Sequence, residues 1–237
     1  MGKYGKWIGG TLGWAFGGPI GGILGFAFGS MLDGVSVTNI STQPTQHGDF
    51  VASLLVLTAA VMKADKKILK SELDYIKQFF LRQFGANVTE QNMLLLREIL
   101  KQEIAVGEVC LQIKQNMDYS ARLQLIHFLF GIAAADGHVH SDEIAVVEDI
   151  ARYMNIQIND ITSIKAMFVK DTESAYNILE ITHDATDEEV KKAYRKMAVK
   201  YHPDKVSHLG EDIQHAAKEK FQQLNAAYEQ IKKQRGL

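Results

Sequence analysis

A run of 26 residues near the N-terminus, from Trp7 to Leu32, contains no charged side chain. A helix of this length, at about 1.5 Å per residue, can cross a hydrocarbon core about 30 Å thick. Membrane contact is therefore the first interpretation of the segment. The many glycines lower helix stability in water, and Pro19 predicts either a kink or a turn in the middle of the run.

Glycine recurs at every fourth position along this run, which leaves one face of a helix without side chains. Two helix backbones can approach each other closely along such a stripe, as they do in associating membrane helices. We therefore expect the segment to form a homodimer through the stripe. The expected contact residues are Gly9, Gly13, Gly17, Gly21, Gly25 and Gly29.

Two topologies are open for the membrane segment. Lys3 and Lys6 favour an N-terminus on the cytoplasmic side. A single span with the N-terminus outside is the commoner design. A re-entrant hairpin that turns at Gly17, Gly18 and Pro19 would instead keep both ends on one side, with short arms whose backbone needs shielding. A cleaved signal peptide is a third interpretation, but the apolar part is too long for one.

Composition and charge exclude several other classes of protein. The formal net charge of −2 at pH 7 lacks the basic surplus that general nucleic-acid binding requires. Cys110 is the only cysteine, so an internal disulfide and a cysteine-based zinc site are excluded. Cys110 is expected in the core, and His127 is expected to be a hydrogen-bonded histidine of the core or the surface and not a ligand. Only three prolines occur in 237 residues, so long helices are easily accommodated and an all-α fold is expected.

Residues 50–170 carry apolar side chains at helical spacing and predict six or seven helices. Two windows of this region repeat one pattern, in which an apolar helix runs into Ala-Asp and a glutamate follows seven residues after the aspartate. Asp65 and Glu72 carry the first copy, and Asp136 and Glu143 carry the second. Each copy predicts a helix, an acidic loop and a second helix.

The acidic loops suggest a metal site. Its candidate ligands are Asp65, Glu72, Asp136, His138, Asp142 and Glu143. The spacing does not match the calcium loop of EF-hand proteins, which needs alternating oxygen ligands and a glycine in mid-loop. Ser71 and Ser141 can instead cap the following helices, and acidic side chains in a first turn complement the helix dipole without an ion. Both interpretations stay open, and no other cofactor is expected.

The doubled Ala-Asp and glutamate pattern resembles the TerB-like domain, a helical domain found in tellurite-resistance proteins and in membrane-anchored J-domain proteins. The resemblance implies a helical bundle and the binding of a metal or a partner, without assigning roles to particular residues.

Residues 171–237 predict a hairpin of two helices preceded by a short helix. Thr186 and Glu189 form a capping box that fixes the start of the first long helix. Five positive side chains follow on two neighbouring rows of this helix, and we expect all five to point outward. They are Lys191, Lys192, Arg195, Lys196 and Lys200.

Pro203 ends this helix, because proline cannot join the helical ladder and keeps His202 out of the helical region. We therefore expect His202 and Asp204 to be displayed on a stiff loop. No nucleophile or metal constellation accompanies them within this short domain, so an enzyme is not expected. A basic face that leads into an exposed turn predicts a partner with a matching acidic surface.

The segments AYNILEI, DEEVKKAYRKMAVKYHPDK and KFQQLNAAYEQI resemble the J domain of DnaJ-type co-chaperones. The resemblance implies docking on a DnaK-type chaperone and acceleration of its ATP hydrolysis, so that the catalytic residues belong to the partner. It implies as contact residues Lys191, Tyr194, Arg195, Lys196, His202, Pro203 and Asp204. Recruitment by location is then a better hypothesis than client binding of the DnaJ kind, because no Gly/Phe-rich region follows the J domain in this sequence and the cysteine repeats of a zinc-binding substrate domain are missing.

The order of the segments resembles the DjlA family of membrane-anchored J-domain co-chaperones. We predict a membrane anchor over residues 1–34, a linker over 35–48, a TerB-like domain over 49–170 and a J domain over 171–237. The resemblance implies a co-chaperone at the bacterial inner membrane, with both domains in the cytoplasm. Two alternatives remain: a metal- or oxyanion-responsive TerB-like binding protein with an accessory J domain, and a membrane scaffold built by the glycine stripe.

Overall fold

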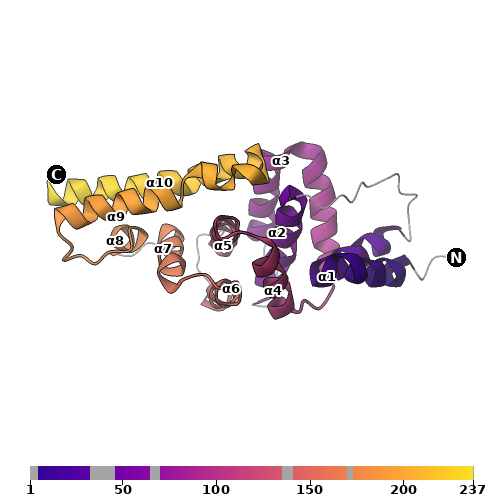
Figure 1. Ribbon diagram of the computed structural model, residues 1–237. Helices are drawn as coiled ribbons and strands as arrows, with labels where there is room; N and C mark the ends of the chain where they lie inside the picture. The colour runs from indigo at the N-terminus through magenta and orange to yellow at the C-terminus, as the bar shows by residue number, and fades with distance from the viewer. Residues whose placement is uncertain (1–4, 33–45, 65–69, 135–140, 170–172, 237) are drawn as a thin grey trace. The chain divides into compact units, whose positions relative to one another are not determined.

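The computed structural model describes residues 5–32, 46–64, 70–134, 141–169 and 173–236. Every regular element in these ranges is a helix, so the predicted all-α fold is confirmed (Figure 1). By its internal contacts the chain divides into two compact units, Met1–Met117 and Asp118–Leu237. The domain boundaries predicted from the sequence stay predictions.

The described residues of the first unit form four helices. They are α1 (Gly5–Leu32), α2 (Gln46–Met62), α3 (Lys70–Ile99) and α4 (Val106–Asn116). Residues 53–62 of α2 are all buried, as expected for a helix that is apolar on every side. The backbone of α3 breaks at Gly85, whose φ of 76° and ψ of 175° are accessible almost only to glycine. Cys110 is buried as predicted, and burial raises the pKa of its thiol to about 12.

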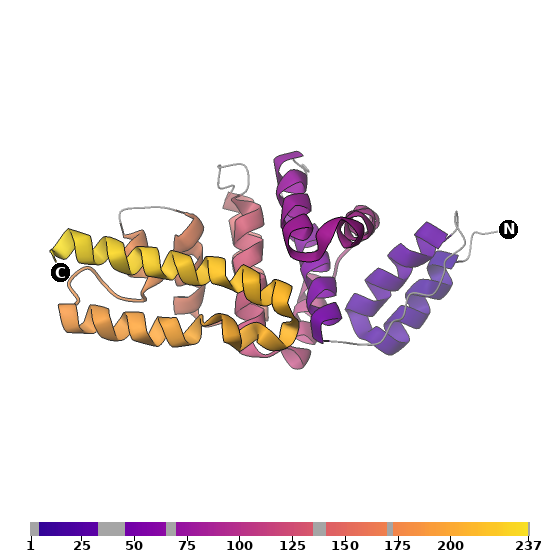
Figure 2. The ribbon, with the colours of Figure 1, turned by 90° about the horizontal axis from the view of Figure 1, so that it is seen from above.

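The N-terminal segment folds back on itself. Gly18 has a φ of 60° and a ψ of −156°, and Pro19 then opens the second arm of α1. The two arms of α1 can be followed in Figure 2. A Cβ atom on Gly13 would overlap the carbonyl oxygen of Gly21, and one on Gly25 would overlap that of Gly9. The glycine stripe therefore packs against itself within one chain. This is the hairpin, and not the single straight helix, of the two topologies left open by the sequence.

A homodimer through the same glycines is not tested by the structure and stays a prediction. Among the described helices, none combines the length and the apolarity that a bilayer crossing requires.

Polar side chains from α3 and α4 fasten this hairpin. The Nε2 of Gln112 donates to the carbonyl of Gly17 at 2.8 Å, and its Oε1 accepts from the N–H of Ile20 at 2.9 Å. These two bonds satisfy backbone groups that the turn removes from the helical ladder. Ser30 donates its hydroxyl to Glu98 at 3.0 Å. The apolar segment is thus docked on α3 and α4 by specific hydrogen bonds as well as by packing.

In the second unit, the residues that the structure describes form six α-helices and one 3₁₀-helix. They are α5 (Tyr119–Ala133), α6 (Ser141–Tyr153), α7 (Ile158–Phe168), α8 (Ser174–Ile178), α9 (Asp187–Lys200), η1 (Pro203–Leu209) and α10 (Glu211–Arg235). Twelve of the fifteen residues of α5 are buried, and α6, α7 and η1 all contact this helix. The predicted hairpin of two long helices is confirmed, since α9 and α10 lie side by side (Figure 2). Val190, Met197, Leu224 and Ile231 form part of its buried core.

His127 of α5 belongs to this core, which decides between the core and surface positions that the sequence left open. Its side chain is buried, and its Nε2 lies 3.1 Å from the Oε1 of Gln223 on α10. Burial lowers the pKa of His127 to about 3, so the imidazole is neutral at ordinary pH.

The close packing of the α1 hairpin predicts that one added methyl group opens it. Gly13→Ala forces a methyl group against the carbonyl of Gly21, whereas a Cβ on Gly17 meets no atom within 4 Å. The rings of Trp7 and Phe26 are 6.0 Å apart in the hairpin, but in one continuous helix these positions would be separated by about 28 Å. Spin labels at the two positions should report a short distance for the parent and for Gly17→Ala, and a lengthened one for Gly13→Ala. Equal distances in all three proteins would contradict the packing.

Candidate functional site

The start of α9 is fixed by the capping box that the sequence predicts. The Oγ1 of Thr186 accepts from the N–H of Glu189 at 3.3 Å, and a carboxylate oxygen of Glu189 accepts from the N–H of Thr186 at 2.7 Å. The backbone hydrogen bond from Thr186 holds the pKa of Glu189 below its usual value. Three acidic residues in the first turn, Asp187, Glu188 and Glu189, also complement the helix dipole.

The outer face of α9 presents positive charge, and its inner face packs against α10. Lys191, Lys192 and Arg195 are exposed. Tyr194 is half-buried: its ring stacks on Tyr228 at 4.2 Å, and its hydroxyl lies 3.0 Å from the side-chain oxygen of Asn225. Tyr194 therefore helps to hold the helix hairpin together as well as bordering its surface.

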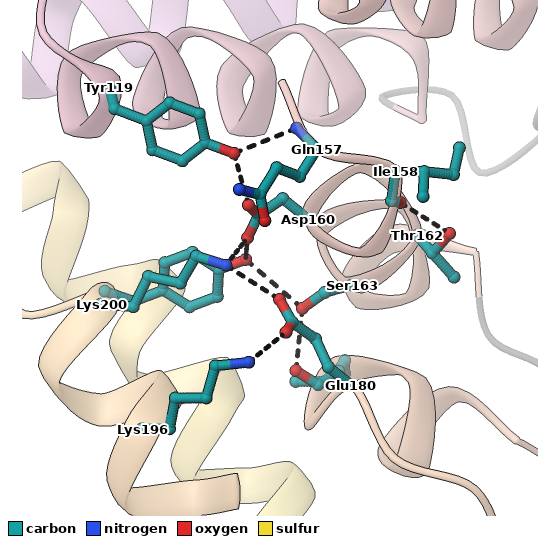
Figure 3. Close-up of polar contacts among 11 residues, drawn as sticks. Tyr119, Gln157, Ile158, Asp160, Thr162, Ser163, Glu180, Lys196 and Lys200 are labelled. Atoms are coloured by element: carbon teal, nitrogen blue, oxygen red, sulfur yellow. Dashed lines mark hydrogen bonds and ion pairs between the residues drawn. The ribbon is translucent and has the colours of Figure 1, made fainter. Parts of the chain in front are cut away.

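The prediction that all five positive side chains point outward is wrong for Lys200. Only 21% of its side chain is exposed, and its ammonium forms ion pairs with Asp160 and Glu180. Lys196 is 66% exposed but also contacts Glu180, at 3.0 Å (Figure 3). Because a buried carboxylate is strongly unfavourable without cationic or hydrogen-bonding partners, these two carboxylates draw the lysines toward them.

The turn after α9 is exposed and tightly held. His202 caps η1, and its Nδ1 accepts from the N–H of Asp204 at 3.3 Å. Pro203 is buried at the first position of η1, whereas the side chains of His202 and Asp204 are 51% and 74% exposed. Gln214 donates to the carboxylate of Asp204 at 2.9 Å. His202 and Asp204 are therefore displayed as predicted, although the chain continues as a 3₁₀-helix and not as a loop.

Burial and neighbouring charges determine the protonation of Glu180 and Tyr201. Burial alone would raise the pKa of Glu180, but hydrogen bonds from Lys200 and Lys196 outweigh it and hold this pKa below its usual value. Burial and the neighbouring Asp160 raise the pKa of Tyr201 well above its ordinary range. Glu180 is therefore ionised and Tyr201 keeps its hydroxyl proton at neutral pH.

Half of the candidate metal ligands lie within the described residues. Asp65, Asp136 and His138 lie outside the described residues. Glu72 and Glu143 are buried at the starts of α3 and α6, and Asp142 is exposed beside Glu143. In the part of the chain that the structure describes, no group of three or more potential ligands gathers. The metal site stays a prediction.

Asp160 and Glu180, the two carboxylates that organise the end of α9, were not predicted from the sequence. Asp160 had a usable signal: its spacing to Ile164 and Met167 places it on the apolar face of α7, where a charge needs partners. Glu180 had none, because its position follows from a left-handed backbone with a φ of 57° at the end of the short helix.

Two antiparallel helices whose basic face leads into an exposed His-Pro-Asp turn define a J-domain protein. The family model of the DnaJ domain matches residues 174–235. The model of the tellurite resistance protein TerB matches residues 52–166, and that of the co-chaperone DjlA transmembrane domain matches residues 1–44. The chain is therefore a DjlA-like J-domain protein with a TerB-like domain. The match at the N-terminus supports membrane association.

Curated relatives agree with the family models. The chain is 25% identical over 276 residues to the co-chaperone protein DjlA of Photobacterium profundum, covering 98% of this chain and 99% of the relative. It is 45% identical over 65 residues to the co-chaperone protein DjlA of Shewanella oneidensis, covering 27% and 25%. It is 54% identical over 54 residues to the chaperone protein DnaJ of Ehrlichia ruminantium, covering 23% and 13%. No solved structure matches the chain.

The lowered pKa of Glu180 predicts that part of the protein's stability is lost in acid. A carboxylate with a lowered pKa stabilises the folded state above its ordinary value of 4.5, and this contribution disappears as the pH falls through the folded-state pKa. Urea unfolding between pH 7 and about pH 2.5 should therefore show a smaller acid loss in Glu180→Gln than in the parent. Glu188→Gln, at an exposed position, should follow the parent. The same acid dependence in Glu180→Gln and the parent would contradict the assignment.

Proposed function

We propose that this protein is a membrane-tethered co-chaperone whose J domain docks on a DnaK-type chaperone and stimulates its ATP hydrolysis. The observation that carries the proposal is the turn of His202 and Asp204, exposed at the end of a helix whose outer face bears Lys191, Lys192 and Arg195. Co-chaperone function is also supported by the relatives named DjlA and by the DnaJ-domain match.

The geometry suits a docking surface that is ordered before binding. Hydrogen bonds from the side chains of Gln214 and Ser207 hold the carboxylate and the carbonyl of Asp204, and the neighbouring Pro203 is buried. A turn that is already rigid loses little conformational entropy when a partner binds it. The positive side chains of α9 would steer an acidic surface of the chaperone toward the turn and fix its register. Nucleotide hydrolysis would take place on the chaperone.

The anchor would restrict this activity to the membrane surface. We place the TerB-like and J domains in the cytoplasm, because a DnaK-type chaperone and its ATP are there in bacteria. A re-entrant α1 hairpin supports this orientation, since it keeps both ends of the segment on one side and agrees with the charge of Lys6. The single-span topology would require the N-terminus outside.

The proposal predicts a loss of stimulation when the turn is changed. In a steady-state ATPase assay of a DnaK-type chaperone with the full chain in detergent, His202→Gln should abolish stimulation, because His202 is exposed at the expected contact. His215→Gln changes an exposed histidine on α10 and should stimulate as the parent does. Full stimulation by His202→Gln would refute the proposed contact.

A second prediction concerns the basic face of α9. Arg195→Ala should raise the concentration needed for half-maximal stimulation by about fivefold at low salt, because a charge at the rim of an interface contributes about 1 kcal/mol. The difference between Arg195→Ala and the parent should shrink at high salt, because screening weakens the attraction that the Arg195 charge supplies in the parent. An effect of Arg195→Ala that is independent of salt would contradict electrostatic steering.

A further inference from the structure

We propose that Asp160, in the TerB-like part of the chain, is a positioning residue for the His-Pro-Asp turn of the J domain. The ATPase test of this inference rests on the proposed co-chaperone function, whereas the hydrogen-exchange test does not. Asp160 lies on α7 within residues 52–166, which match TerB, whereas the side chains it holds lie within residues 174–235, which match the DnaJ domain. All of them belong to one compact unit.

Asp160 is fully buried and its carboxylate has donors on both oxygens. Tyr119 of α5 donates its hydroxyl to Oδ2 at 2.6 Å, and Tyr201 donates to Oδ1 at 3.2 Å. Lys200 forms an ion pair with Oδ1 (Figure 3). A wholly buried carboxylate is strongly unfavourable unless such partners surround it. Its burial therefore dictates where the side chains of Lys200 and Tyr201 must lie.

The donor Tyr119 is itself fixed within the TerB-like part. Its hydroxyl oxygen accepts from the N–H of Gln157, just before α7, at 3.0 Å (Figure 3). Burial and the hydrogen bond to Asp160 raise the pKa of Tyr119 to about 12, so the hydroxyl stays protonated and can donate. One oxygen of Asp160 is thus bonded within the TerB-like part, and the other is bonded by the J-domain side chains.

The side chains that Asp160 holds are the two that precede His202 in the chain. Only 2% of Tyr201 is exposed, and its hydroxyl also lies 3.4 Å from the Oγ of Ser163 on α7. The ammonium of the buried Lys220 lies 4.7 Å from the centre of the Tyr201 ring. With Lys200 and Tyr201 fixed, the backbone enters the turn at His202 in one direction.

A second contact holds the chain after the turn. The Nε2 of His208, in η1, lies 2.8 Å from the Oδ2 of Asp118. Asp118 is the N-cap of α5 and accepts from the N–H of Ala121 at 2.8 Å with its other oxygen. Residues of the TerB-like part therefore hold the chain both before and after His202. The turn has a fixed orientation relative to α5 and α7.

This arrangement predicts a specific kinetic change in the variant Asp160→Asn of the full chain. Positioning of the turn should govern the maximal stimulation of a DnaK-type chaperone, while the exposed charges of α9 should govern the concentration at half-maximal stimulation. Asp160→Asn should therefore lower the maximum by about 3–10-fold and leave the half-maximal concentration unchanged. A variant that only unfolds in part would show the opposite, because its folded molecules would still reach the full maximum at a higher total concentration.

A double-mutant cycle separates positioning from direct contact by Lys200. If Lys200 acts through Asp160, Lys200→Gln should lower the maximum as Asp160→Asn does, and the double variant should be no worse than either single one. If Lys200 touches the chaperone directly, its effect should appear in the half-maximal concentration and add to that of Asp160→Asn. The second result would overturn the proposal. Asp149→Asn, an exposed aspartate on α6, is the control and should match the parent.

Hydrogen exchange supplies a measurement that does not need the chaperone. In Asp160→Asn, the amides of residues 201–209 should exchange faster, while those of the buried helix α5 keep their protection. Unchanged exchange at 201–209, an unchanged maximum, or a change confined to the half-maximal concentration would each overturn the proposal. If the parent itself fails to stimulate any DnaK-type chaperone, the proposed function fails, and hydrogen exchange still decides whether Asp160 positions the turn.

Discussion

The buried carboxylate of Asp160 is the constraint on which the second unit depends. A carboxyl group without access to water requires hydrogen-bond or ion-pair partners, and here they come from α5 and from the end of α9. Meeting this requirement draws Lys200 inward and buries Tyr201. The exposed positive side chains of α9 therefore lie at its earlier positions. The turn that follows is consequently part of a larger helical body and not the tip of an isolated hairpin.

The first unit is organised by a steric constraint instead of a charge. Gly13 and Gly21 allow the arms of α1 to approach to backbone contact, and Gly18 supplies the conformation that reverses the chain. Gln112 then satisfies the polar groups of that turn. Glycines spaced four residues apart can thus pair two arms of one chain as readily as two chains. Here they pair the two arms of α1.

Local rules predicted much of the fold and part of the site. The capping box at Thr186, the end of α9 before Pro203 and the helix hairpin each follow from residues close together in the sequence. The inward position of Lys200 could not be predicted, because its partner Asp160 is 40 residues away and only tertiary packing brings the two together. The reversal of α1 remained one of two topologies, since its glycine pattern suits both.

The most direct test of docking through the His202 turn is photo-crosslinking from a residue close to this turn. Val199 is 64% exposed and lies immediately before Lys200, whereas the exposed Thr182 precedes the opposite end of α9. With ATP present, a photoreactive side chain at position 199 should crosslink to a DnaK-type chaperone, and one at position 182 should not. Equal crosslinking from both positions, or none from position 199 while stimulation persists, would contradict docking through the His202 turn.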